Sequence, residues 1–283
     1  MASLSLGTWW RRLTESQVDA WPLARTRIVV GILAFVRGLE GARVLQHVTS
    51  PDTLRLPYVA GMPLLARMEV PWLIGAWLLA ALAFTVGWRT RLAGGVLCLT
   101  LLRVLTADQQ AYSSHLYLLL LLVLVLSWGE SSAVAGLDAR RSGARAQVPG
   151  WPVFLLAVQG SVVYGYAAVL KLIPAYLSGA VLCAHFGWLH RQSPPVMTCA
   201  TLAAGSIITE LFLATALWRR SLWRWACLVG VGFHIAMIAM LSAEVRLQLV
   251  VFTGEMLVLY PLYPIAVRMV KDARTTNAGT AIV

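Results

Sequence analysis

The most informative shortage in this sequence is of charged side chains. Asp, Glu, Lys and Arg make up 12% of the 283 residues, whereas 59% are hydrophobic. A soluble domain carries roughly 25% charged residues. A chain with so few charges and so many apolar side chains is typical of an integral membrane protein.

Acidic residues are the scarcer of the charged residues. The chain has 12 Asp and Glu against 23 Lys and Arg, which gives a formal net charge of +11. Such an excess can indicate nucleic-acid binding, but here the arginines are dispersed between apolar runs and do not gather with aromatic residues on one face. We therefore expect no nucleic acid partner. Membrane topology explains the excess better, because cytoplasmic loops retain Lys and Arg.

Paired cysteines and a cleavable leader are also missing. Cys98, Cys183, Cys199 and Cys227 show no CxxC or related spacing, which argues against a redox motif or a zinc site. We expect them to be buried small apolar residues, and we expect no bound metal. Residues 1–22 contain acidic residues and no uninterrupted apolar run before a small-residue cleavage site, so we expect this segment to be retained.

Long apolar segments, in contrast, fill most of the chain. A helix needs about 20 mostly apolar residues to cross a bilayer. Eight segments approach this length, and the first and third fit least well. The segments are Trp21–Gln46, Val70–Trp88, Leu92–Thr106, Tyr112–Trp128, Trp151–Ile173, Val196–Trp218, Leu222–Ser242 and Val245–Tyr263.

The basic residues between these segments predict their orientation. If all eight cross the membrane, the loops on one side carry thirteen basic residues and those on the other side carry four, so the richer side is cytoplasmic. The thirteen are Arg11, Arg12, Arg89, Arg91, Arg140, Arg141, Arg145, Arg219, Arg220, Arg224, Arg268, Lys271 and Arg274. The four are Arg55, Arg67, Arg191 and Arg246.

The sequence thus predicts an all-α fold, a polytopic integral membrane helical bundle with about eight transmembrane helices and both termini cytoplasmic. The gaps between the apolar segments are too short to hold a separate soluble domain. We expect residues 1–270 to form a single transmembrane domain and residues 271–283 a flexible cytoplasmic tail. Composition alone leaves the oligomeric state open.

Ionisable residues inside the apolar segments point to a polar site. Such a residue at mid-membrane costs roughly 2.5–3.5 kcal/mol, so it usually faces a cavity or a partner. Counting along the helices places these residues in the outer half of the membrane on five helices, which predicts a polar cavity open to the non-cytoplasmic side. The residues are Arg37, Glu40, Arg103, His115, Lys171 and His234.

Each of these residues also has a structural interpretation. Lys171, which shares a helical face with Tyr164, could simply extend its ammonium group to the lipid headgroups. His115 and His234 could be hydrogen-bonded packing residues.

The remaining charges leave similar alternatives open. Arg37 and Glu40 are three residues apart and can form an ion pair that makes insertion tolerable, and Arg103 can be a structural group of the same kind. Glu210, deep in its helix, and Glu255 can be protonated carboxyl groups bonded to neighbours. The sequence leaves the role of both glutamates open.

Several motifs in a fixed order resemble one family of membrane proteins. The chain resembles the membrane domain of vitamin K-dependent gamma-glutamyl carboxylase and its bacterial relatives, the horizontally transferred transmembrane (HTTM) family. The resemblance extends from about Leu23 to Tyr263. It rests on "GLDARR", "VPGWP", "QGSVVYGYAAVLKLIPAYLSG" and "FHIAMIAM", supported by "SSHLYL" and "TELFLA".

The resemblance implies a chemistry. In the carboxylase, the lysine that matches Lys171 deprotonates vitamin K hydroquinone; reaction with oxygen then makes a stronger base, which removes a proton from glutamate so that carbon dioxide can add. The histidine that matches His115 is implicated in carboxylation, although Ser113 and Ser114 stand where the family has asparagines. The implied cofactors are a reduced quinone (vitamin K hydroquinone or menaquinol), oxygen and carbon dioxide.

The first functional hypothesis is a quinol-coupled enzyme of carboxylase type, with lyase chemistry, in a bacterial plasma (inner) membrane. It would act on a peptide or small substrate at the non-cytoplasmic face. Lys171, His115 and His234 are its expected catalytic residues, since a lysine in its neutral form can accept the phenolic proton of a quinol. The expected cofactor-binding residues are Tyr164, Arg103, Arg37 and Glu40.

Two other classes stay open. The chain also resembles the HTTM protein of the sporulation-delaying toxin system, which implies a non-carboxylating membrane maturation or export factor for a secreted peptide. Alternatively, the polar layer merely holds the helices of a structural or binding protein together. Besides the lipid bilayer and a quinone, a secreted peptide is therefore a possible partner.

Overall fold

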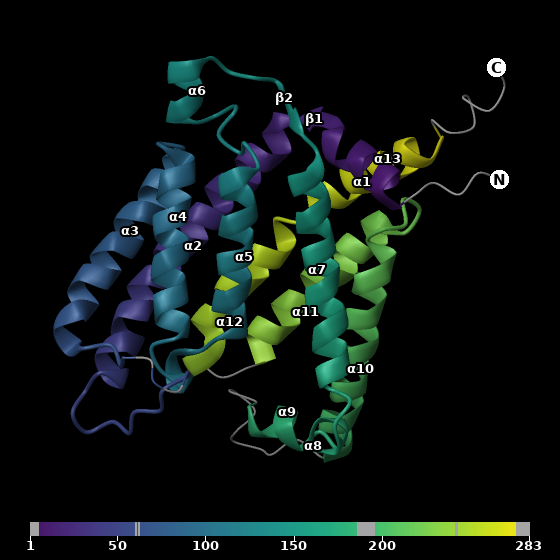
Figure 1. The fold of residues 1–283 in the computed structure, drawn as a ribbon. Coiled ribbons are helices and arrows are strands. Elements are labelled where there is room, and N and C mark those ends of the chain that lie inside the picture. The colour runs from purple at the N-terminus through teal and green to yellow at the C-terminus, as the bar shows by residue number, and fades with distance from the viewer. Residues whose placement is uncertain (1–5, 60, 62, 186–195, 241–242, 276–283) are drawn as a thin grey trace, which may run out of the picture. The chain divides into compact units, whose positions relative to one another are not determined.

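The computed structural model describes residues 6–59, 61, 63–185, 196–240 and 243–275, and these are almost entirely helical (Figure 1). The chain forms two compact units. One comprises Thr14–Pro152, and the other comprises Met1–Leu13 together with Val153–Val283. We call them the N-terminal unit and the C-terminal unit and describe each by itself.

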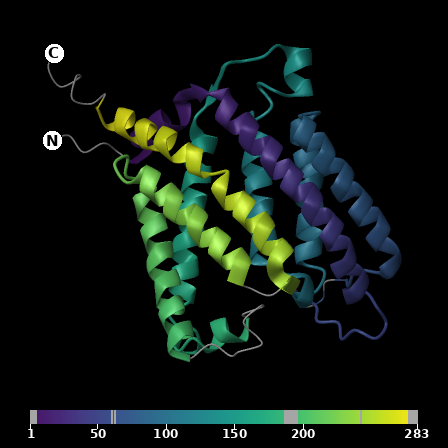
Figure 2. The ribbon, with the colours of Figure 1, turned by 180° about the vertical axis from the view of Figure 1, so that it is seen from behind.

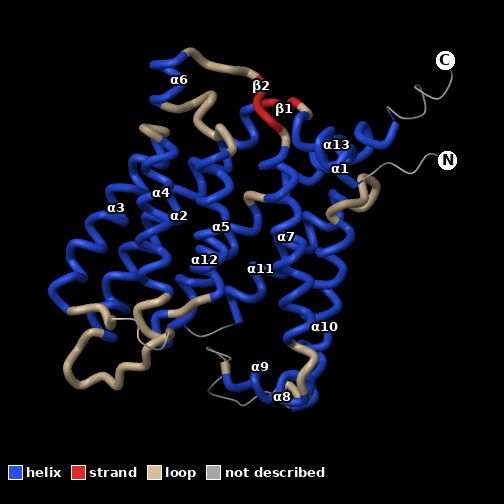
Figure 3. The backbone as a smooth tube through the Cα atoms, viewed as in Figure 1, coloured by secondary structure: helices blue, strands red, loops and turns tan. Residues whose placement is uncertain are grey.

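The N-terminal unit contains four long helices and one short strand pair. Strands β1 and β2 are antiparallel, with Val18 opposite Val148, and they are the two strands of the described chain (Figure 3). The elements of this unit are β1 (Gln17–Asp19), α2 (Ala20–Val48), η1 (Arg67–Glu69), α3 (Val70–Val86), α4 (Thr90–Leu105), η2 (Gln109–Ala111), α5 (Ser114–Trp128), α6 (Leu137–Ser142) and β2 (Gln147–Pro149).

Small residues let the helices of this unit pack closely. A Cβ atom on Gly31 of α2 would overlap Thr85 of α3, and one on Gly94 of α4 would overlap the Ser127 side chain of α5. The indole N–H of Trp77 donates a 2.9 Å hydrogen bond to the Ala34 carbonyl. Close backbone approach of this kind is the usual way in which helices associate where lipid surrounds them.

A buried arginine fixes one end of α3. Arg27 is fully buried, and its guanidinium donates hydrogen bonds to the carbonyls of Phe84 (2.6 Å), Thr85 (2.6 Å), Ser131 (3.2 Å) and Ala135 (2.8 Å). The last carbonyls of a helix have no intrahelical partner, and a cation there also interacts favourably with the helix dipole. Arg27 therefore joins α2, the end of α3 and the loop after α5.

An aspartate holds the start of α4 in the same way. Asp138 of α6 accepts hydrogen bonds from the backbone N–H of Arg89 (2.8 Å) and of Thr90 (2.9 Å) and from the Thr90 hydroxyl (2.8 Å). Its own N–H donates to the Gly87 carbonyl at 2.8 Å. A carboxylate at a helix N-terminus satisfies free N–H groups and interacts favourably with the dipole, so Asp138 fastens α6 to α4.

The C-terminal unit is built around α7, α10, α11 and α12. Helix α11 packs against both α10 and α12, as the view from behind shows (Figure 2). Phe154 at the start of α7 packs edge-on against Trp9 and Trp218, and Trp218 packs against Tyr263. The elements are α1 (Leu6–Glu15), α7 (Trp151–Leu170), α8 (Pro174–Leu177), α9 (Ala180–Ala184), α10 (Val196–Ala216), α11 (Trp223–Met240), α12 (Ala243–Leu257), η4 (Tyr260–Leu262) and α13 (Tyr263–Thr275).

Five helical stretches of the described chain are long and apolar enough to cross a membrane, and α5 is a shorter apolar helix. The stretches are Arg67–Val86, Trp151–Leu170, Met197–Ala216, Trp223–Met240 and Arg246–Ala273. Each of the eight predicted segments contains a helix, which confirms the helical membrane bundle. The count of eight transmembrane helices and the cytoplasmic termini stay predictions. Helix α13 continues to Thr275, and the rest of the predicted tail lies outside the described residues.

The contacts of Asp138 make the N-terminal unit sensitive to acid. Partial burial raises the pKa of Asp138, but hydrogen bonds from Thr90, Arg89 and Ser132 outweigh this and lower the pKa below its ordinary value. A depressed pKa means that the carboxylate stabilises the fold above the unfolded-state pKa and that this contribution is lost as the pH falls through the folded-state pKa.

We expect Asp138→Asn to lower the free energy of unfolding by about 1–3 kcal/mol near neutral pH, because hydrogen bonds to a charged group are lost. Thermal unfolding in detergent measures this. The difference from the unsubstituted protein should shrink as the pH falls below about 4 and should be lost below the depressed folded-state pKa, where the wild-type carboxyl group is protonated as well. Asp52→Asn, at an exposed position, is the matched control. A difference between the Asp138 proteins that does not change with pH would contradict this account.

Candidate functional site

Lys171 lies directly after the last residue of α7. Its backbone N–H still donates to the Ala168 carbonyl at 3.3 Å, but the chain then leaves the helix at Ile173, which is extended, and Pro174 begins α8. Proline disfavours a helical conformation in the residue before it, so the helix has to end here. The observed helix therefore ends three residues before the end of the predicted segment, and Lys171 stands at the helix terminus.

The ammonium group of Lys171 forms an ion pair with Glu210 of α10. The side chains are 21% and 6% exposed, so most of the pair is inside the protein. The ammonium group also lies 5.5 Å from the centroid of the Tyr176 ring. The second carboxylate oxygen of Glu210, Oε2, is buried and has no hydrogen-bond partner among the described residues. The site thus presents one buried acceptor atom beside a partly exposed cation.

The sequence allowed Glu210 to be a protonated carboxyl group bonded to a neighbour, but it did not identify Lys171 as that neighbour. The first turns of α10 pack against α8 and α9, since the Tyr176 hydroxyl is 3.0 Å from Ser206 Oγ. Glu210 lies only one turn beyond Ser206. Counting residues from the start of α10 therefore overestimates the distance between Glu210 and the residues that follow α7. An acidic residue in one apolar helix and a lone lysine in another were the only signal available in the sequence.

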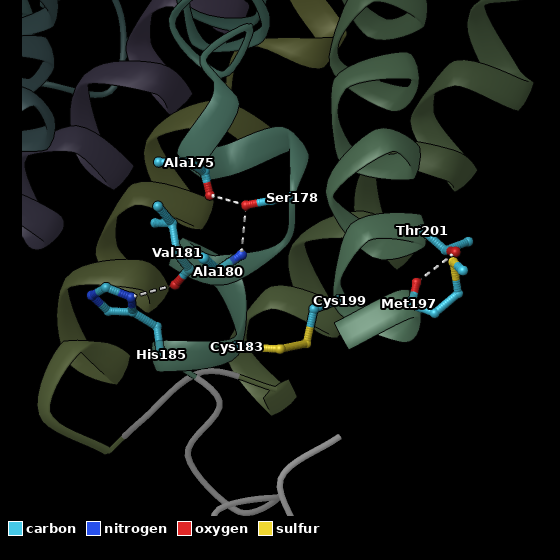
Figure 4. Close-up of a disulfide and its surroundings, with 9 residues drawn as sticks. All are labelled: Ala175, Ser178, Ala180, Val181, Cys183, His185, Met197, Cys199 and Thr201. Carbon is cyan, nitrogen blue, oxygen red and sulfur yellow. Dashed lines mark hydrogen bonds between the residues drawn. A yellow bond between two sulfur atoms is a disulfide. The ribbon is translucent and has the colours of Figure 1, made fainter. Parts of the chain in front are cut away.

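A disulfide joins Cys183 of α9 to Cys199 of α10, with Cα atoms 5.7 Å apart (Figure 4). The prediction of four unpaired buried cysteines is wrong for these two. Their separation of 16 residues matches no short motif. Gly179 has φ 79° and lies against the backbone of Cys199, where a Cβ atom would overlap it. Cys98 and Cys227 are free.

A second polar cluster lies around Tyr164, about two turns before the end of α7. The Tyr164 hydroxyl is 2.8 Å from His234 Nε2 and 2.6 Å from the Tyr260 hydroxyl. His234 is fully buried, and Thr253 Oγ1 lies 3.3 Å from its Nδ1. Gly230 of α11 leaves the space that the Tyr260 hydroxyl occupies, because a Cβ atom there would overlap it. His234 is thus buried and hydrogen-bonded, as its structural interpretation requires, and Tyr164 is its direct partner.

The two clusters adjoin in the C-terminal unit. Lys171 directly follows α7 and comes seven residues after Tyr164, which separates the two by about 10 Å along the helix axis. Glu210 lies near enough to interact electrostatically with Tyr164. The cation, the carboxylate and the Tyr–His–Tyr group therefore form one polar region inside an apolar helical unit.

The other predicted site residues lie in the N-terminal unit. The predicted ion pair between Arg37 and Glu40 is confirmed, with side chains 8% and 14% exposed. His115 lies within electrostatic range of Arg37. Arg103 is 3.8 Å from Glu69 and donates a 3.2 Å hydrogen bond to the Pro63 carbonyl, which supports its structural interpretation. The single cavity shared by all these residues stays a prediction.

Within the described ranges, no group of three or more His, Cys, Asp and Glu side chains could hold a metal ion. The groups available for chemistry in the C-terminal unit are therefore an amine, a carboxylate, an imidazole and phenolic hydroxyls, all of which can exchange protons.

These features define a polytopic helical membrane protein with a buried lysine–glutamate pair next to a Tyr–His–Tyr hydrogen-bond group. The family model described as the HTTM domain matches residues 16–263. The chain belongs to the HTTM domain family. No curated protein and no solved structure matched it.

The ion pair makes a testable contribution to stability. Lys171→Met should leave Glu210 as an unpaired buried carboxylate, and Glu210→Gln should leave the ammonium group without its counter-charge, so each change should destabilise the protein. The double variant should be more stable than the sum of the two losses predicts, with a coupling free energy of about 1–3 kcal/mol. Thermal unfolding of the four proteins in detergent gives this value, and strictly additive losses would contradict the pairing.

Proposed function

We propose that this HTTM protein is a membrane-embedded, quinol-coupled enzyme of the vitamin K-dependent carboxylase type. Lys171 is the base that accepts the phenolic proton. The observation that carries the proposal is the Lys171–Glu210 pair: an amine at a helix end, held by a buried carboxylate with one unused oxygen. The match of the HTTM domain supports the same assignment at the level of the family.

The ion pair supplies the form of lysine that a base requires. An ammonium group cannot accept a proton, but transfer of its proton to the adjacent carboxylate yields a neutral amine beside a neutral acid. In an apolar interior this exchange removes two buried charges at once, and burial disfavours the charged forms. Glu210 therefore holds the proton while Lys171 Nζ takes a new one. The two groups titrate as a pair and not as independent sites.

The residues present fit a reduced quinone. Glu210 Oε2 can accept a hydrogen bond from a phenolic hydroxyl, and the side chain of Lys171 is partly exposed at the end of a helix that meets lipid. When bound, the quinol supplies a phenolic proton and, by reaction with oxygen, the driving force for removing a proton from a glutamyl substrate so that carbon dioxide can add. The protein's own residues bind the hydroxyl, orient it and receive its proton.

Tyr164 and His234 are the next groups to which this proton can move. Glu210 is within electrostatic range of Tyr164, and the phenol is hydrogen-bonded to His234 Nε2. Hydroxyl and imidazole groups in contact can pass a proton without large movements. His115, in the N-terminal unit beside Arg37, remains the second proposed catalytic residue by resemblance. Arg37, Glu40 and Arg103 remain proposed cofactor-binding residues.

The proposed side of the membrane is non-cytoplasmic. Lys171 follows the end of α7 at the end of the C-terminal unit that also carries the Cys183–Cys199 disulfide (Figure 4). Disulfides persist in oxidising compartments and are rare in the cytosol. The opposite end of the same unit holds Arg219, Arg220 and Arg224, which favours a cytoplasmic position for that end. Both observations support a site on the non-cytoplasmic side, and a bacterial plasma membrane remains the proposed location by resemblance.

The proposal is tested with purified protein in lipid nanodiscs, supplied with menaquinol or vitamin K hydroquinone, oxygen, labelled bicarbonate and a glutamyl peptide. We expect Lys171→Ala to lower the rate of quinone epoxide formation by about 100-fold or more, since a positioned base contributes 10²–10⁴-fold. Lys271→Ala, which changes the only other lysine of the chain, should leave the rate unchanged.

Two results would overturn this assignment. Equal epoxide formation by the Lys171 and Lys271 variants would show that Lys171 is not the base. No epoxide formation and no labelled peptide with the unsubstituted protein would exclude carboxylase-type chemistry.

A further inference from the structure

A polar pocket of about 410 Å³ lies in the N-terminal unit, apart from every residue used in the proposed function. Three arginines line it, Arg89, Arg91 and Arg145, together with the carboxylates of Glu130 and Asp138. The other lining residues are mainly small or carry hydroxyl groups. Its lining residues come from the start of α4, the loop after α5 and the region of the short helix α6, and these elements are labelled in Figure 1.

Both carboxylates of this pocket are already neutralised by other groups. Glu130 is ion-paired with Arg145 at 2.9 Å. Asp138 is held by the first N–H groups of α4 and lies within electrostatic range of Arg27. Arg89 and Arg91 are exposed, and neither makes an ion pair within the described part of the chain. The pocket therefore presents two guanidinium groups without a counter-charge.

The backbone around the pocket is held in an unusual conformation. Among the described residues, three that are not glycine have positive φ: Arg89 (45°), Glu130 (55°) and Ala135 (51°). All three belong to the two loops beside the pocket, and the first two line it. Such conformations persist only where the surrounding structure enforces them, and they concentrate at binding sites. Here Asp138 bonds the backbone N–H of Arg89, and Arg27 bonds the carbonyl of Ala135. These contacts hold both loops, so the backbone of Arg89 is fixed beside the pocket.

Tryptophans place this pocket at the level of the lipid headgroups. The guanidinium of Arg91 lies 5.9 Å from the Trp128 ring centroid. Trp128 ends α5 and Trp88 follows α3, and they are 61% and 44% exposed. Exposed tryptophans at the ends of apolar helices mark the boundary between the hydrocarbon and the headgroups. A ligand of this pocket can therefore belong to a lipid whose chains stay in the bilayer.

We propose that this pocket binds the phosphate headgroup of an anionic phospholipid, with Arg89 and Arg91 as the phosphate-binding residues. Guanidinium groups present several N–H donors in a plane and match phosphate oxygens, and basic pockets among transmembrane helices are suited to anionic headgroups. Trp128 packs on Arg91 and keeps it at the pocket. The site binds lipid independently of the reaction at Lys171.

The test is native mass spectrometry of the full protein released from detergent that contains phosphatidylglycerol and phosphatidylcholine with equal acyl chains. The unsubstituted protein should retain phosphatidylglycerol preferentially. Arg89→Gln/Arg91→Gln should lower that affinity by about tenfold or more, because each basic residue near anionic lipid contributes about 1 kcal/mol. The matched control is Arg219→Gln/Arg220→Gln, an exposed arginine pair in the C-terminal unit, which should retain the lipid normally.

Further measurements keep the test decisive. Thermal unfolding in phosphatidylcholine alone checks that the double variant folds, and if it does not, Arg91→Gln alone replaces it, with a smaller but measurable loss expected. Equal retention of phosphatidylglycerol by the variant and the unsubstituted protein would overturn the proposal. Inorganic phosphate is the last probe: if it displaces the lipid and binds as tightly by itself, the pocket is a site for soluble phosphate and the lipid assignment is wrong.

Discussion

An ionisable group in an apolar helical protein must have a partner, and this requirement governs the arrangement of the whole chain. Lys171 has Glu210, and Arg37 has Glu40, each across a short distance inside its unit. Arg27 has four carbonyls, two at the end of α3 and two in the loop after α5. Since an unpaired charge in this environment costs several kcal/mol, each pairing fixes the helices that carry it.

The two ion pairs differ in their position and in their exposure. Arg37 and Glu40 lie on one helix and are both mostly buried, so each compensates the charge of the other within α2. Lys171 and Glu210 come from different helices, and the lysine keeps some exposure at the end of α7. Only the second pair combines a partly accessible amine, an unused carboxylate oxygen and a hydrogen-bonded histidine nearby. This combination is why the proposed chemistry is assigned to the C-terminal unit.

The helices and the position of Lys171 at a helix end could be predicted from the sequence, because apolar runs and a lone lysine before a proline are local signals. The partner of Lys171 and the pairing of the two cysteines could not be predicted. Glu210 and the Cys183–Cys199 disulfide depend on how α8 and α9 pack on the first turns of α10, and no spacing rule describes that packing. The Arg37–Glu40 pair was predictable because a separation of three residues on one helix already determines the contact.

The central claim is that Glu210 stores the proton that Lys171 gives up when a quinol binds. Infrared difference spectroscopy of the protein in nanodiscs, with and without menaquinol under anaerobic conditions, measures this directly, because protonated and ionised carboxyl groups absorb differently. We predict that quinol binding produces a protonated-carboxyl band, which disappears in Glu210→Gln and remains in Glu130→Gln, a change far from the pair in sequence. A band that persists in Glu210→Gln, or no band in the unsubstituted protein, would contradict the account.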